Sequence, residues 1–134
     1  MNRSKVIVVP CGDYDEEHVY NAMRAGIDEL GGIETFVGKE EKILVKTNFL
    51  SPQDMDSAVV THPSVIKGML RILQEEGYAD VSYGDSPGHG TSKAAVRKLG
   101  LDESNSFGAK IADMNEEKKV HFEECKTCKD FIFT

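Results

Sequence analysis

Long apolar runs and paired cysteines are both scarce in this sequence. No apolar segment approaches the roughly 20 residues that a membrane-spanning helix needs. The N-terminus turns acidic at residues 13–17, before a signal-type apolar region of adequate length develops. The three cysteines are an odd number, which fits a reducing compartment better than a disulfide framework. We therefore expect a cytoplasmic protein that does not have a membrane as its partner.

Positive charge is scarce as well. The chain has 16 lysines and arginines against 23 aspartates and glutamates, which gives a net charge of −7. No stripe of basic residues stands out that would neutralise a run of phosphates. We therefore expect no nucleic-acid partner.

Two alternating periodicities predict the fold. Short apolar runs at residues 5–9, 42–46 and 79–83 are typical of parallel strands that are covered on both faces. Apolar side chains at helical spacing follow each run, and parallel strands need such crossovers because tight turns cannot join them. We predict one α/β domain over residues 1–134: a three-layer, Rossmann-like sandwich with a mainly parallel sheet of about four to five strands.

Helix signals and a weaker strand signal complete this prediction. The spacing predicts helices near residues 15–30, 63–76 and 92–99, and a fourth strand around 110–112. Proline suits the first helical position at residue 63, because no amide donor is needed there. Either Thr91 or Ser92 is expected to cap the third helix, and the tail, with its apolar ending at residues 131–133, carries no clear pattern.

Candidate ligand-binding residues follow the ends of the predicted strands. In an open parallel sheet, ligands collect beyond the carboxyl ends of the strands, where the strand-to-helix loops meet. Polar loops that merely make turns and caps are the alternative for the same residues. The candidates are Lys46, Asn48, Thr61, His62, Asp85, Ser86, Gly88 and Gly90.

Residues 84–88 contain the pattern Gly-x-Ser-x-Gly between a predicted strand and a predicted helix, where hydrolases place a nucleophilic serine. That role requires a backbone N–H on the next residue, and Pro87 has none. Proline also biases Ser86 toward an extended backbone. The sequence therefore argues against a serine hydrolase. Formal Walker A and dinucleotide-binding motifs are absent too, although glycines ahead of a helix still suit a generic anion site.

Lys46, His62 and the cysteines leave alternatives open. An interior strand seldom ends in an uncompensated charge, so an anionic ligand or an acidic neighbour should face Lys46. His62 is either an acid/base or metal ligand, or a cap beside a helix-starting proline. Cys125 and Cys128 supply at most half of a four-thiolate site, and Cys11 is distant in sequence, so we expect no iron–sulfur cluster within one chain.

Three spaced motifs occur in a fixed order along the chain. A strand ends in Lys-x-Asn at residue 46, a helix begins with Thr-His-Pro at residue 61, and Gly-Asp-Ser-Pro-Gly begins at residue 84. This succession resembles the bacterial and archaeal family called domain of unknown function 362, over residues 5–90 and on to about residue 114. The resemblance assigns importance to Lys46, Asn48, Thr61, His62, Asp85, Ser86 and Gly88.

The resemblance also implies a biochemical setting. Many members of that family are associated with ferredoxin-like modules that hold 4Fe-4S clusters, which implies redox or electron transfer for the longer proteins. The family pattern continues past the length of this chain, so we expect the chain to be the N-terminal part of a longer architecture. No cofactor is expected within the chain itself, apart from a divalent metal as a candidate ligand.

Two functions of different classes follow. The first is a domain of a redox-linked enzyme that binds a small anionic ligand or a metal, with His62 and Asp85 as catalytic residues and Lys46 as a fixed positive charge. The second is a non-catalytic scaffold that docks or presents an iron–sulfur module, in which the same residues cap helices and fix turns. A shared site around Lys46, His62 and Asp85 favours the first, and separate capping bonds favour the second.

Overall fold

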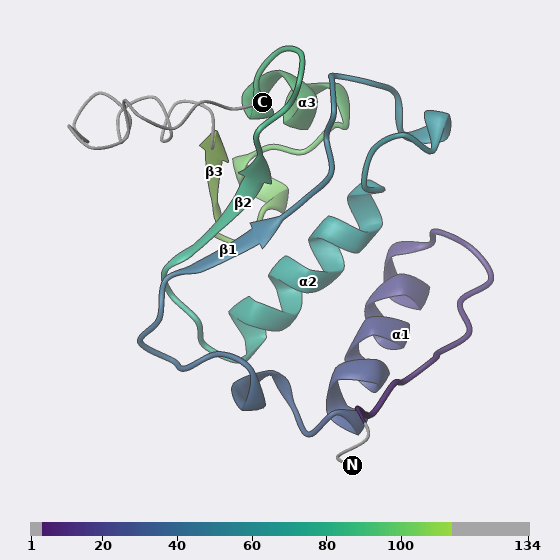
Figure 1. Ribbon diagram of the computed structural model, residues 1–134, viewed down its shortest axis with the longest axis vertical. Helices are drawn as coiled ribbons and strands as arrows, with labels where there is room; N and C mark the ends of the chain where they lie inside the picture. The colour runs from purple at the N-terminus through teal and green to yellow at the C-terminus, as the bar shows by residue number, and fades with distance from the viewer. Residues whose placement is uncertain (1–3, 114–134) are drawn as a thin grey trace, which may run out of the picture.

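A computed structural model describes residues 4–113 as a parallel sheet with its helices on one side (Figure 1). Three helices and three strands alternate along these residues, beginning with a helix, and short 3-10 helices lie between some of them. The elements are α1 (Glu16–Glu29), η1 (Ile33–Thr35), β1 (Ile43–Lys46), η2 (Met55–Ser57), α2 (Pro63–Glu75), β2 (Val81–Asp85), α3 (Ser92–Lys98), η3 (Glu103–Asn105) and β3 (Lys110–Asp113).

The three strands pair in parallel in the order β1-β2-β3. The register places Lys46 opposite Gly84 and Asp85 opposite Asp113, so the carboxyl ends of all three strands lie at one edge of the sheet. The parallel pairing predicted for the runs at 42–46 and 79–83 is confirmed, as is the strand near residue 110. The second of these strands begins two residues later than predicted, at Val81.

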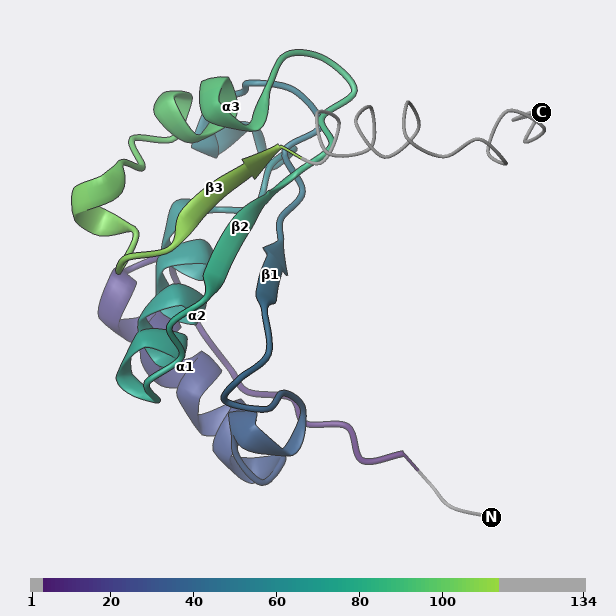
Figure 2. The same ribbon diagram turned by 90° about the vertical axis from the view of Figure 1, so that its left-hand side faces the viewer.

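The helices cover one face of the sheet, so the layering differs from the predicted sandwich. Both crossovers step in the same direction across the sheet, and crossovers of one hand that step the same way put their helices on the same face. Figure 2 shows α2 and α3 on that face, with α1 beyond α2. Residues 4–113 therefore form three strands rather than four to five, with one face of the sheet uncovered by helices.

The strand predicted at residues 5–9 is wrong. These residues have no regular secondary structure; they run beside α1, where Lys5 bonds the carbonyl of Glu29. Val6 and Val8 are 79% and 88% exposed. A short apolar run favours extended backbone but does not specify a partner strand, and here α1 packs against α2 and holds the segment away from the sheet.

Helix ends follow local rules. The carboxylate of Asp15 accepts hydrogen bonds from the amides of Glu17 and His18, which caps α1. Pro63 occupies the first turn of α2, and the hydroxyl of Thr91 caps α3, both as predicted. Gly77 follows α2 with φ of 80°, a conformation that glycine adopts without strain. No helix within residues 4–113 is long and apolar enough to span a bilayer.

One apolar core lies between the helices and the covered face of the sheet. Side chains at alternate positions of β1, β2 and β3 point into it, and the apolar faces of α2 and α3 close it. The buried members are Phe49, Val60, Ile66, Leu70, Leu73, Tyr78, Val81, Tyr83, Ala95, Val96, Leu99 and Leu101.

Two buried tyrosines differ in how their hydroxyls are satisfied. The Tyr78 hydroxyl donates to the carbonyl of Val37 at 2.8 Å. Tyr83 is 0% exposed, and its buried hydroxyl has no hydrogen-bond partner among residues 4–113. An unpaired buried hydroxyl opposes folding, whereas a paired one contributes to it.

We expect Tyr83→Phe to raise the free energy of unfolding by about 1 kcal/mol, since it removes a polar group that folding strips of water. Tyr78→Phe makes the same chemical change at a paired hydroxyl and should lower that free energy by about 1 kcal/mol. Urea unfolding of both variants measures the difference. Equal changes of the same sign in the free energy of unfolding would contradict the view that the Tyr78 hydroxyl is paired and the Tyr83 hydroxyl is not.

Candidate functional site

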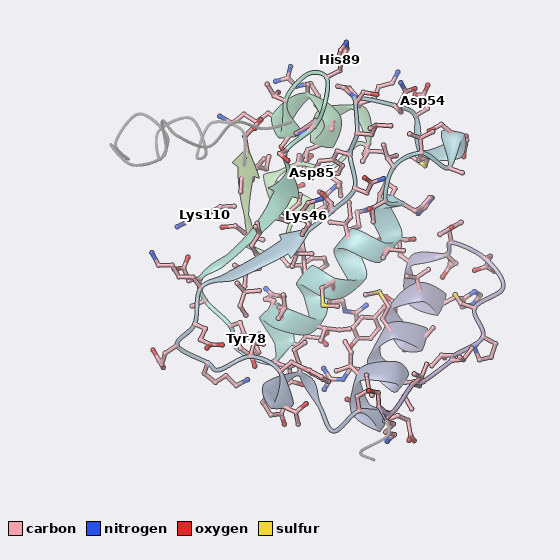
Figure 3. The ribbon with its side chains drawn as sticks, in the orientation of Figure 1. Lys46, Asp54, Tyr78, Asp85, His89 and Lys110 are labelled. Atoms are coloured by element: carbon pink, nitrogen blue, oxygen red, sulfur yellow. The ribbon has the colours of Figure 1, made fainter. Side chains whose placement is uncertain are left out.

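Lys46 ends β1 and lies against Asp85, which ends β2 (Figure 3). The Lys46 Nζ atom is 2.5 Å from Asp85 Oδ1 and 2.6 Å from the carbonyl oxygen of Thr47. The Lys46 side chain is 53% exposed, whereas that of Asp85 is 7% exposed. The acidic neighbour expected for Lys46 is therefore Asp85, reached from the adjacent strand.

Asp85 is bonded on both carboxylate oxygens. Besides Lys46, Oδ1 accepts the backbone N–H of Ser86 at 2.8 Å, and Oδ2 accepts that of Phe49 at 2.8 Å. Burial disfavours the charged carboxylate, but the bonds from Lys46, Phe49 and Ser86 outweigh it and lower the pKa of Asp85 below its usual value. Asp85 is therefore a structural anion that joins the ends of two strands to the loop after β1.

The loop from residue 47 to residue 62 is closed on itself by Asn48 and Thr61. The Asn48 amide donates to Thr61 Oγ1 at 2.9 Å, and the Thr61 amide donates to the Asn48 carbonyl at 2.9 Å. The Asn48 side chain adds a bond to the carbonyl of Val59 at 3.0 Å. These two predicted site residues therefore join the two arms of one loop, with Phe49 fully buried beneath them.

His62 caps α2. Its Nδ1 accepts the Ser64 amide at 3.2 Å and is 2.8 Å from the Ser64 hydroxyl. The Tyr14 ring stacks on the imidazole, with the ring centroids 4.1 Å apart. His62 thus has the capping role that the sequence left as one of its two alternatives, and its bonds do not involve Lys46 or Asp85.

The loop after β2 packs against the loop after β1. The His89 amide donates to the Leu50 carbonyl at 3.2 Å, and a side chain at Gly90 would lie 3.0 Å from Pro52. Gly90 also has φ of 78°, so both its backbone conformation and the nearby Pro52 favour glycine at this position. Ser86 is not among the described residues with positive φ, in agreement with the argument against a nucleophile elbow.

Sequence reasoning did not place Ser92 and Asp113 at this edge, since it considered Ser92 only as a cap of α3 and did not consider Asp113. Ser92 is fully buried, and its hydroxyl donates to the Asp85 carbonyl at 2.9 Å and accepts the Asp85 amide at 3.1 Å. The Ser92 amide donates to Asp113 Oδ2 at 2.9 Å. Only the strand register, which sets Asp113 beside Asp85, could have identified this pair, because neither residue belongs to a motif.

Gly84 permits the close approach of the strands at this edge. A Cβ atom at Gly84 would lie 1.9 Å from the Ala112 carbonyl oxygen, which excludes any other residue without movement of the backbone. Glycine also leaves open the face of the sheet on which its neighbour Lys46 lies. The close approach of Ala112 therefore explains why the first residue of the Gly-Asp-Ser-Pro-Gly motif is glycine.

The chemistry available at this edge is that of a positioned ammonium group. Asp85 Oδ1 already has two donors and Oδ2 has one, so little capacity remains for a metal ion. Within residues 4–113, no group of three or more histidine, cysteine, aspartate or glutamate side chains is arranged to hold a metal. Cys125 and Cys128 lie outside the described residues.

The motifs at this edge lie within a segment that matches a known protein family. Residues 43–134 match the family described as Domain of unknown function (DUF362). This chain belongs to the DUF362 family. The match begins at β1, so the N-terminal arm and α1, which the resemblance had included, lie outside it.

One relative of this DUF362 chain is the thylakoid-associated protein sll1697 of Synechocystis sp. The two are 26% identical over 87 residues, which cover 65% of this chain and 27% of that protein. The chain thus spans about a quarter of the length of this relative. No solved structure matches the chain.

Asp85→Asn should lower the free energy of unfolding at neutral pH by about 1–3 kcal/mol, because the amide NH2 turns a donor toward Lys46 or a backbone N–H. The pKa of Asp85 is lowered in the folded state, so its stabilisation is complete above the ordinary aspartate pKa of about 4 and is lost as the pH falls through the folded value. The variant should therefore lose less stability on acidification than the unmodified protein.

Urea unfolding from neutral to acidic pH measures both effects. Asp56→Asn, at an exposed position of η2, is the matched control and should change stability little. Equal stability of Asp85→Asn and the unmodified protein at neutral pH would contradict the structural role of this carboxylate.

Proposed function

We propose that the carboxyl edge of the sheet binds a small anionic ligand, a carboxylate or a phosphate, through the Lys46 ammonium group. The single observation that carries the proposal is the ion pair between a half-exposed lysine and a buried aspartate. The buried carboxylate fixes the ammonium in place, and the exposed part of the side chain gives a ligand access to it. Lys46 thereby offers a preorganised charge at the edge where parallel sheets bind ligands.

The hydrogen-bond capacity of Lys46 supports this proposal. An ammonium group has three donors, and two of them are directed at Asp85 Oδ1 and the Thr47 carbonyl. The third N–H of the ammonium group is available to an anionic oxygen of a ligand that approaches from solvent. Ser86 follows Asp85 directly and brings its hydroxyl to the same edge. The occupied state of the Asp85 oxygens favours an anion over a divalent metal as the ligand.

The biochemical setting is the wider part of the proposal. We assign the domain to a redox-linked enzyme whose longer family members hold 4Fe-4S clusters, and the support for this assignment is the family resemblance alone. The geometry gives His62 a capping role, so the proposal assigns no proton transfer to it. Lys46 is the binding residue, and Asp85 is the positioning residue that holds it.

A scaffold that docks or presents an iron–sulfur module is the second candidate. It is favoured by the bonds of the motif residues, because His62 caps α2, Asn48 and Thr61 close a loop, and Asp85 joins loops. A scaffold of this kind would need the same rigid edge without a ligand at Lys46. The two candidates therefore differ in whether the edge binds a small anion.

An NMR titration of the backbone amides with inorganic phosphate, at constant ionic strength, separates them. We expect saturable shifts at the amides of Ser86 and Gly88, and about tenfold weaker binding in Lys46→Gln, because a charge-assisted bond is lost. Lys42→Gln removes an exposed lysine just before β1 and should leave the affinity unchanged. Shifts that do not saturate, or equal losses in the two variants, would contradict anion binding and favour the scaffold.

A further inference from the structure

The face of the sheet opposite the helices is uncovered among residues 4–113 (Figure 2). Leu44 on this face is 40% exposed, whereas Tyr83, which points to the other face, is 0% exposed. Parallel sheets are found almost only with both faces covered, so a covering element is expected here. Side-chain alternation and the strand register give the members of this open face as Leu44, Lys46, Ser82, Gly84, Lys110 and Ala112.

The open face is rich in positive charge. Lys110 begins β3, and Lys42 comes just before β1, at a position that the alternation places on the same face. Neither lysine has an ion-pair partner among residues 4–113, and Figure 3 shows the Lys110 side chain directed away from α2. The same alternation adds Asp80, so three lysines stand against one aspartate in a chain with a net charge of −7. An acidic partner would complement this face. By contrast, ion pairs hold Lys39, Lys46, Lys67 and Lys98.

The segment that follows β3 has the composition that the open face requires. Residues 114–134 lie outside the described part of the chain and continue from β3, which ends at the carboxyl edge of this face. Residues 114–124 contain four glutamates and two lysines, and the glutamates form pairs at 116–117 and 123–124. Val120 and Phe122 lie between the two pairs. The stretch therefore combines negative charge with apolar side chains, which complement the lysines and Leu44.

The length of this stretch fits the open face as well. Three strands about 4.8 Å apart, with about 3.3 Å per residue along each, make a face of roughly 10–15 Å in either direction. The eleven residues 114–124 span about 16 Å as a helix and up to about 36 Å as an extended chain. Either conformation reaches across the face from the end of β3. Residues 43–134 match the DUF362 family as one segment, so the family pattern includes both the strands and this stretch.

A second copy of the chain would complement the open face less well. Two such faces packed together would bring Lys42 and Lys110 of one copy toward the lysines of the other, and like charges oppose association. The net charge of −7 on each copy adds to the repulsion. The charges therefore favour the segment after β3 over a second open face.

We propose that residues 114–124 dock on the open face, with their glutamates beside Lys42 and Lys110 and with Phe122 against Leu44. Gly84 has no side chain and the neighbouring Ala112 has only a methyl group, so the centre of the face has room for a large apolar side chain. The docked segment covers the second face of the sheet, as parallel strands require. This proposal does not depend on anion binding at the carboxyl edge.

Disulfide trapping in the full chain tests the proposal. The parent variant carries Cys11→Ser and Cys128→Ser, so its one remaining thiol is that of Cys125, directly after the acidic stretch. Ser82→Cys adds a thiol at the centre of the open face. Arg97→Cys adds one at an exposed position of α3, on the other side of the sheet and nearer in sequence to residue 125. We expect the disulfide within one chain to form at least about tenfold faster from position 82 than from position 97, because docking raises the effective concentration of the thiols.

Two controls accompany the trapping. Each rate is divided by the rate at which the added thiol reacts with glutathione, which corrects for differences in thiol reactivity, and backbone-amide NMR spectra check that the variants are folded. The double change Lys42→Glu and Lys110→Glu should slow trapping at position 82 severalfold through repulsion of the glutamates. Lys93→Glu reverses an exposed charge on α3 and should leave the rate unchanged.

Three outcomes would overturn the proposal. Equal corrected rates at positions 82 and 97 would show that the segment has no preference for the open face. Disulfides between chains, rather than within one, would assign the face to a second copy. Trapping that is unchanged by the double charge reversal would contradict the pairing of the glutamates with Lys42 and Lys110. The phosphate titration reports on the amides of Ser86 and Gly88 instead, so either proposal can fail while the other holds.

Discussion

A buried carboxylate must be bonded on all sides, and this requirement at Asp85 organises the carboxyl edge of the sheet. Its donors come from three places along the chain: the end of β1, the loop after β1, and the residue that follows β2. The backbone of the same residue is held by the Ser92 hydroxyl at the start of α3. One side chain therefore fixes where both loops leave the sheet and where the lysine of the first strand lies.

The function proposed for the edge follows from what these bonds leave accessible. Asn48, Thr61 and His62 are engaged with nearby backbone or side chains, so the motifs are largely structural. Lys46 differs, because half of its side chain faces solvent while its partner is buried. The strands step in one direction only, so the described sheet contains no reversal of strand order, where a crevice would form. The ligand expected at Lys46 is for that reason a small one at an open edge.

Sequence periodicity predicted the helices and the parallel strands β1 and β2, but it did not show which apolar run would stay outside the sheet. The runs that became β1 and β2 and the faces of α2 were readable because apolar spacing is a local property. The run at residues 5–9 has the same apolar pattern but lies beside α1, since pattern does not specify pairing. The link of Asp113 and Ser92 to Asp85 could not be predicted, because only the register of the strands brings them together. His62 was correctly considered as a cap, on account of the following proline.

Native-state hydrogen exchange at the Phe49 amide tests the central claim most directly. This amide lies in a loop, outside any strand or helix, but it donates to a buried carboxylate. We expect it to exchange about as slowly as the amides of β2, because its release requires the opening of the Asp85 network. Exchange at the rate of the exposed loop amides around Asp54 would contradict the view that Asp85 holds this edge together.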